Sequence, residues 1–211
     1  MRLAIVWLGL LALGSRGLAG CDRAGADESG VAGRPRGVRE RPPVHVDSAL
    51  SREEHLRRFT AGLADRPTRL SGGRTSVEAL VRDYLSAAAR GDTAALRAMH
   101  LSRAEFAFLY YDTDPRSRPP YELPPGLLWF QLEMTSLQGL RRLSTFLRAG
   151  GIEVLGVECP HPPEVQGPNR LYRNCIVAYR RNGREARHAG LVGPIIERDG
   201  HFKFLTFANR L

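Results

Sequence analysis

The sequence contains one lysine, Lys203, although it has 31 basic residues and a formal net charge of +9. Its positive charge is therefore almost entirely arginine, spread along the chain with no run of five or more basic residues. Aromatic side chains that would stack on bases are not grouped with the arginines. We therefore predict no nucleic-acid partner.

The sequence also lacks the short motifs of several enzyme and metal-binding classes. It has no GxSxG nucleophile elbow, no phosphate-cradling loop and no dinucleotide-binding fingerprint. Its histidines, among them His161, His188 and His201, are scattered without the spacing of metal ligands. We predict no metal site and no cofactor, and we favour a protein that is not an enzyme.

Long apolar runs are almost absent, apart from residues 3–13, which follow Arg2. This run is shorter than the roughly 20 apolar residues that a membrane-spanning helix needs. It fits the central part of a signal peptide. Residues 18–21, which read Leu-Ala-Gly-Cys, resemble the lipobox of bacterial lipoproteins.

The resemblance to lipoproteins implies a processing route and a location. In that family the chain is cut between the residues corresponding to Gly20 and Cys21, and the Cys21 thiol receives a diacylglycerol. The new amino terminus is usually acylated as well, and several acyl chains together make a lasting anchor. We therefore expect a protein of the bacterial cell envelope, held to a membrane by lipid and facing the periplasm or the exterior.

Composition divides the chain into three parts. Residues 1–20 are the predicted signal peptide. Residues 21–50 comprise the lipidated cysteine and a stretch rich in Gly, Pro and Arg with no aromatic residue, which predicts a flexible tether. Residues 51–211 carry the periodic apolar patterns of one folded domain.

Helix signals dominate the first half of this domain. Ser51 with Glu54 and Thr75 with Glu78 are capping boxes, and apolar residues follow each at helical spacing. Helices are predicted over residues 51–67, 75–91, 93–100 and 125–149, and residues 102–111 favour a helix over a strand. One apolar face of the longest helix is predicted to contain Phe130, Met134, Leu137, Leu140, Leu143 and Leu147.

Strand signals dominate the second half. Strands are predicted over residues 152–159, 171–180, 185–197 and 201–208. Asn182-Gly183 and Asp199-Gly200 favour two-residue hairpin turns. Pro194, inside the third predicted strand, indicates a bulge or an edge. The expected fold class is α+β, with N-terminal helices packed on a curved antiparallel sheet of about four strands.

Residues 76–85 followed by residues 89–96 resemble the opening helices of the nuclear transport factor two superfamily and its SnoaL-like members, with a Gly-Asp turn between them. The resemblance covers about residues 75–208. It implies a cone in which helices cover a concave sheet around a pocket. Enzymes of this family commonly carry an Asp-His or Tyr-Asp pair, which we cannot place in this sequence.

Two cysteines remain once Cys21 is assigned to the lipid. Cys159 and Cys175 are an even pair in an exported chain, which predicts a disulfide. Its closure of the intervening loop would restrict the unfolded chain by ~3 kcal/mol.

Six residues are candidates for lining a pocket. Tyr110 or Tyr111 would act as an acid or orient a ligand if Asp112 polarised its hydroxyl, and His100 is nearby. Trp129 and Glu133 share a helix face, where an enclosed carboxylate would have a raised pKa. The alternative is structural: packed aromatic residues, Asp112 and Asp114 capping the turn before Pro115, and a solvated Glu133.

These observations lead to one function and two alternatives. We predict a membrane-anchored lipoprotein whose domain binds a small apolar ligand or an envelope protein without catalysis, with a homodimer possible. One alternative is a small periplasmic SnoaL-like hydrolase or isomerase. The other is a structural or assembly factor of the envelope.

Overall fold

The computed structural model describes residues 50–211, in which helices come first and strands last. This order confirms the predicted α+β class. The predicted signal peptide, the cleavage site at Gly20 and Cys21, and nearly all of the predicted tether lie outside the described residues. The helices are α1 (Arg52–Thr60), α2 (Val77–Arg90), α3 (Thr93–Met99), α4 (Arg103–Glu105) and α5 (Pro125–Arg148).

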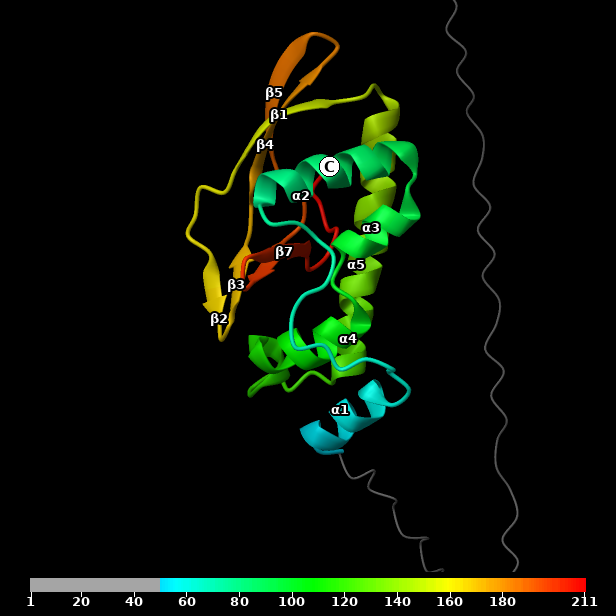
Figure 1. Ribbon diagram of the computed structural model, residues 1–211, viewed down its shortest axis with the longest axis vertical. Helices are drawn as coiled ribbons and strands as arrows, with labels where there is room; N and C mark the ends of the chain where they lie inside the picture. The colour runs from blue at the N-terminus through cyan, green and yellow to red at the C-terminus, as the bar shows by residue number, and fades with distance from the viewer. Residues whose placement is uncertain (1–49) are drawn as a thin grey trace, which may run out of the picture. The chain divides into compact units, whose positions relative to one another are not determined.

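Irregular helical turns continue α4 toward α5. They are η1 (Phe106–Tyr110), η2 (Tyr111–Thr113) and η3 (Pro115–Ser117). The helix predicted from residue 102 is therefore confirmed in an irregular form. Its start is a complete capping box, because Ser102 and Glu105 each accept the other's backbone N–H. Figure 1 shows this segment beside α1, with α3 lying along α5.

One predicted helix start and one predicted helix end need correction. Residue Ser76, rather than Thr75, caps α2 by accepting from the backbone of Ala79. Helix α1 ends at Thr60, well before Pro67, because Gly62 adopts a positive φ just beyond it. The predicted turn between α2 and α3 is confirmed, with Gly91 at a φ of 68° and Asp92 capping α3.

The strands form two antiparallel sheets. The prediction of one curved sheet of about four strands is therefore wrong. One sheet has the order β1-β4-β5 and the other β2-β3-β6-β7, and they neither close nor curl into a cone. The strands are β1 (Glu153–Glu158), β2 (Glu164–Gln166), β3 (Asn169–Tyr172), β4 (Ile176–Arg181), β5 (Arg184–Ala189), β6 (Ile195–Arg198) and β7 (His201–Phe204).

Breaks in two predicted strands create the second sheet. Between β3 and β4 the chain turns at Asn174, whose φ is 55°, so that β3 pairs with β6 and β4 pairs with β1. Between β5 and β6 the chain leaves one sheet for the other, with Gly193 in close contact with the backbone around Thr206. Pro194 lies in this break rather than in a bulge within a strand. The hairpin turns at Asn182-Gly183 and Asp199-Gly200 are confirmed by their positive φ angles.

Helix α5 packs through a different face from the predicted one. Its buried residues include Leu128, Leu132 and Leu143, together with Ser136 and Gly139 at the closest approach. Only Leu143 of the predicted apolar face is buried, whereas Phe130, Met134 and Leu137 are exposed. The small residues allow the segment at Phe207 to lie directly against the helix, where larger side chains would not fit.

Buried side chains form two clusters. One is centred on Tyr84, Leu143 and Phe204 and joins α2 to the sheets; the other is centred on Phe106, Leu128 and Ile196 and joins α1 to the irregular turns. Among residues 50–211, no helix combines the length and the apolar character needed to cross a lipid bilayer.

Candidate functional site

The six candidate pocket residues do not form one pocket. Tyr110 lines a polar cavity, while His100, Trp129 and Glu133 line a separate apolar groove between α3 and α5. The remaining two lie in neither. Tyr111 is buried, its hydroxyl donates to the carbonyl of Leu123 at 3.0 Å, and the Asp112 carboxylate is exposed and paired with Arg52 at 2.6 Å.

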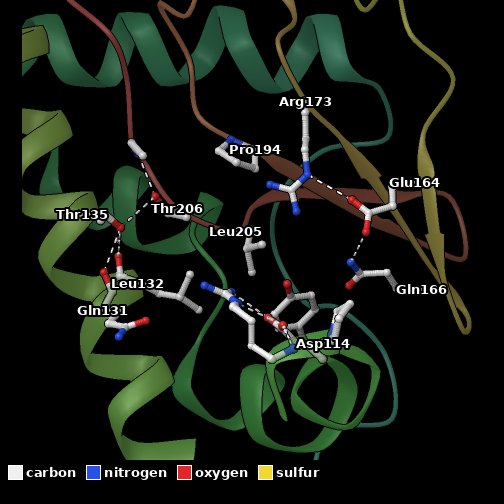
Figure 2. Close-up of a pocket in the computed structure, with 14 residues that line it drawn as sticks. Asp114, Gln131, Leu132, Thr135, Glu164, Gln166, Arg173, Pro194, Leu205 and Thr206 are labelled. Atoms are coloured by element: carbon white, nitrogen blue, oxygen red, sulfur yellow. Dashed lines mark hydrogen bonds and ion pairs between the residues drawn. The ribbon is translucent and has the colours of Figure 1, made fainter. Parts of the chain in front are cut away.

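The polar cavity encloses about 630 Å³, which lies within the ordinary size range of small-molecule sites. Figure 2 shows its two walls: α5 with Thr135 and Gln131 on one side, and the β2–β3 region with Glu164 and Arg173 on the other. The η1–η3 segment closes one end. The polar side chains that line the cavity are those of Tyr110, Asp114, Arg116, Gln131, Thr135, Glu164, Gln166, Arg173 and Thr206.

Asp114 is a buried carboxylate that Arg116 neutralises. It accepts hydrogen bonds from the backbone N–H, Nε and a terminal nitrogen of Arg116, at 2.9, 3.0 and 2.7 Å. Burial by itself would raise the pKa of Asp114, but the Arg116 hydrogen bonds outweigh it and hold the pKa below its ordinary value. Asp114 also caps η3, as the structural interpretation of the sequence predicts.

Tyr110 lines the cavity together with this carboxylate. Burial, followed by the negative charge of Asp114, raises the pKa of Tyr110. The phenol therefore keeps its proton at neutral pH. The carboxylate beside it stays ionised, and this pairing of Tyr110 with Asp114 replaces the predicted pairing with Asp112.

The opposite wall offers unused hydrogen-bonding atoms. Glu164 accepts from Gln166 Nε2 at 2.6 Å and from Arg173 Nε at 3.2 Å, and these bonds lower its pKa. The Arg173 side chain is 46 % exposed, and its two terminal nitrogens donate no hydrogen bond to any residue of the described part. Gln166 is only 7 % exposed, yet its Oε1 has no hydrogen-bond partner there. A buried amide oxygen without a partner carries a free-energy penalty that a bound donor would remove.

His100 lies in the apolar groove with a structural hydrogen bond. Its Nε2 is 3.0 Å from Ser136 Oγ, which donates to the carbonyl of Leu132 and accepts from the backbone N–H of Phe207. Because the serine proton is used, His100 Nε2 is the donor. Burial lowers the pKa of His100 to about 4, so that the ring is neutral and Ser136 is not activated as a nucleophile.

Cys159 and Cys175 form a disulfide, which confirms the predicted pairing. The bridge lies at the end of the β1–β4 ladder, one position beyond the pair Glu158 and Ile176. It closes the loop that contains β2 and β3. That loop supplies three polar residues of the cavity: Glu164, Gln166 and Arg173.

Comparisons with protein family models, curated proteins and solved structures found no match. The resemblance to the nuclear transport factor two superfamily therefore stays a prediction.

Sequence reasoning missed most of the cavity. Four of its residues belong to elements that come together only through the second sheet, which was not predicted. They are Arg116, Glu164, Gln166 and Arg173. One local signal was present: Gly167-Pro168 is a turn dipeptide that separates β2 from β3. It identifies the hairpin but not its position against α5.

Proposed function

We propose that this protein is an exported bacterial lipoprotein, anchored through Cys21, whose α+β domain holds a small polar ligand in the cavity without catalysis. The anchor rests on the lipobox of residues 18–21. The binding function rests on one observation: Gln166 and Arg173 line the same cavity, and both have side-chain atoms without a hydrogen-bond partner among residues 50–211.

The ligand class follows from these atoms. Two terminal guanidinium nitrogens favour a carboxylate or another acceptor with two oxygens. An ammonium, amide or hydroxyl group on the same molecule would offer a donor to Gln166 Oε1. A compact ligand that carries both kinds of group fits better than the small apolar ligand that the sequence suggested.

Binding is favoured over catalysis because the titratable groups are already engaged. Acid–base catalysis needs a group whose pKa lies near the working pH. Asp114 is held ionised by Arg116, and the raised pKa of Tyr110 keeps the phenol protonated. Neither group is poised to exchange a proton at neutral pH.

The test is mass spectrometry of the native protein extracted from membranes. The intact mass is expected to correspond to a chain that starts at Cys21 and carries acyl groups. Gentle ionisation is expected to retain a small polar molecule that denaturation releases. The variants Arg173→Gln and Gln166→Leu should lose this molecule, whereas Arg184→Gln, an arginine of β5 outside the cavity, should keep it.

Two results would contradict the proposal separately. A chain without acyl mass, found in the soluble fraction, would exclude the anchor. Equal retention of the molecule by Arg173→Gln and the unchanged protein would exclude this cavity as its binding site. If Tyr110→Phe lost the co-purified molecule while Arg173→Gln and Gln166→Leu both kept it, the binding site would lie closer to η1.

A further inference from the structure

Helix α5 carries an exposed apolar stripe. Its members are Leu127, Phe130, Met134 and Leu137, with exposed fractions of 45 %, 57 %, 39 % and 50 %. Their spacing of three and four residues places them on one face of the helix. This face is distinct from the face of Leu128, Leu132 and Leu143, which packs in the core.

The stripe borders the apolar groove between α3 and α5. The groove encloses about 670 Å³, and Trp129, Leu140 and Phe207 contribute to its lining. The stripe and the groove together make a continuous apolar surface on one side of α5. Surfaces of this kind mark contact with a protein or a membrane.

Basic side chains surround this surface. Arg97 and Arg103 line the groove, and Arg141 follows Leu137 by one helical turn. All three are exposed, and none of them forms an ion pair with a carboxylate of residues 50–211. Arg103 is engaged with α1, because it donates to the carbonyl of Phe59 at 2.8 Å and lies over the Phe59 ring. Glu133 is the single acidic residue of the groove lining. The surrounding charge therefore favours an anionic partner.

The chain enters the domain through α1, which packs against α5. Helix α1, the first described helix, packs against the beginning of α5, where Phe59 lies next to Gly126 and Leu128. The predicted tether thus leads into α1, whose far end at Phe59 packs against the end of α5 where the stripe begins. A flexible tether of about 29 residues would have a root-mean-square length of roughly 30 Å. It would keep the stripe at a high effective concentration near the anchoring membrane.

We infer that the stripe of α5 docks on the anionic surface of the membrane that holds the lipid anchor. This inference rests on the proposed anchoring through Cys21. Apolar side chains would insert between the headgroups, and Arg97 and Arg141 would contact lipid phosphates. A second copy of the chain is a poorer occupant, because a two-fold interface would bring the same arginines together.

The chain carries its own probe for this contact. It has two tryptophans, Trp7 in the predicted signal peptide and Trp129 in the groove, so that Trp129 is the only one left after cleavage. The full acylated protein is placed in nanodiscs of phosphatidylcholine and phosphatidylglycerol whose acyl chains carry bromine, a collisional quencher. Docking predicts a clear loss of Trp129 emission relative to nanodiscs without bromine. Nanodiscs of phosphatidylcholine alone should give a smaller loss.

Variants separate docking from anchoring. The double variant Phe130→Glu/Leu137→Glu should remain acylated and folded but should regain most of the lost emission. The matched control Tyr121→Glu/Val165→Glu places the same charges on exposed apolar residues outside the stripe and should be quenched like the unchanged protein. Circular dichroism checks that all of the variants fold.

Three outcomes would overturn the inference. If bromine left the Trp129 emission of acylated, nanodisc-bound protein unchanged, docking would be excluded, but the proposed anchor would stand. If a soluble brominated fatty acid quenched Trp129 emission but brominated nanodiscs did not, the groove would be a binding site for a free amphiphile. Dimers that Phe130→Glu/Leu137→Glu dissociates would assign the stripe to a second copy. Protein that never enters the nanodisc would instead refute the proposed anchor.

Discussion

Lys203, the only lysine of the chain, is buried against Glu105. Their side chains are 3 % and 1 % exposed, and the Nζ–Oε2 distance is 2.8 Å. Lys203 also donates to the carbonyl of Ser71, and Glu105 accepts from the backbone of Ser71 and Ser102. Each charged group thus has hydrogen-bond partners in addition to its counter-charge, which is the condition under which a buried ion pair is tolerated.

Removal of one partner should destabilise the protein strongly. Lys203→Met leaves the Glu105 carboxylate without its counter-charge, and the free energy of unfolding should fall by roughly 3–5 kcal/mol. Urea denaturation measures this change. The double variant Glu105→Gln/Lys203→Met removes both charges and should recover part of the loss. A double variant that is no more stable than Lys203→Met would contradict a charge-based explanation.

His100 predicts a pH dependence of stability. Burial lowers its pKa in the folded protein from 6.5 to about 4, so the unfolded chain binds this proton first as the pH falls. The stabilising contribution is complete above pH 6.5 and is lost progressively toward pH 4. The difference between the two pKa values corresponds to about 3 kcal/mol.

Thermal unfolding between pH 7 and pH 4 tests this expectation. His100→Gln should flatten the pH dependence in this interval, whatever its effect on stability at pH 7. His161→Gln, at an exposed position, should leave the dependence of the unchanged protein intact. Identical slopes for His100→Gln and the unchanged protein would mean that another group is responsible.

At the scale of elements, the contact between α5 and the C-terminal segment depends on Gly139. Alanine normally stabilises a helix by ~1 kcal/mol relative to glycine. At Gly139, however, a Cβ atom would overlap the backbone carbonyl of Phe207. Gly139→Ala should therefore lower the thermal midpoint. Gly126→Ala, in the same helix but with only an ordinary 3.9 Å contact to Phe59, should leave it unchanged or raise it.

Helices were more predictable from the sequence than sheets because their signals are local. The caps at Ser51, Asp92 and Ser102 and the glycine at position 91 are read from neighbouring residues. Sheet membership depends on partners far along the chain. The apolar pattern therefore did not reveal that residues 171–180 divide between β3 of one sheet and β4 of the other.

The exposed face of α5 was mispredicted for a related reason. Leucine and phenylalanine at helical spacing predict a buried face, but the face that packs was selected by the small residues Ser136 and Gly139. Periodicity contains no information about such close approach. The cavity was missed because Asp114, Gln166 and Arg173 come from elements that meet only in the folded chain.

At the scale of the whole domain, the Cys159–Cys175 bridge connects both sheets to the cavity. It extends the β1–β4 pairing of one sheet and closes the loop that contains β2 and β3 of the other. An exported location would keep such a bridge oxidised. Loss of the bridge should therefore affect both global stability and the cavity wall that carries Gln166 and Arg173.

The double variant Cys159→Ser/Cys175→Ser separates these two effects. The loop-entropy model predicts a loss of about 3 kcal/mol, which corresponds to a decrease of roughly 6–12 °C in the thermal midpoint. Reducing agent should reproduce this decrease in the unchanged protein and have no further effect on the variant. Because β3 still pairs with β6, the variant should remain folded at low temperature but retain less of the cavity ligand in native mass spectrometry. An unchanged midpoint would show that the bridge adds no constraint beyond the sheets, and unchanged retention would show that β2 and β3 hold the wall of the cavity without it.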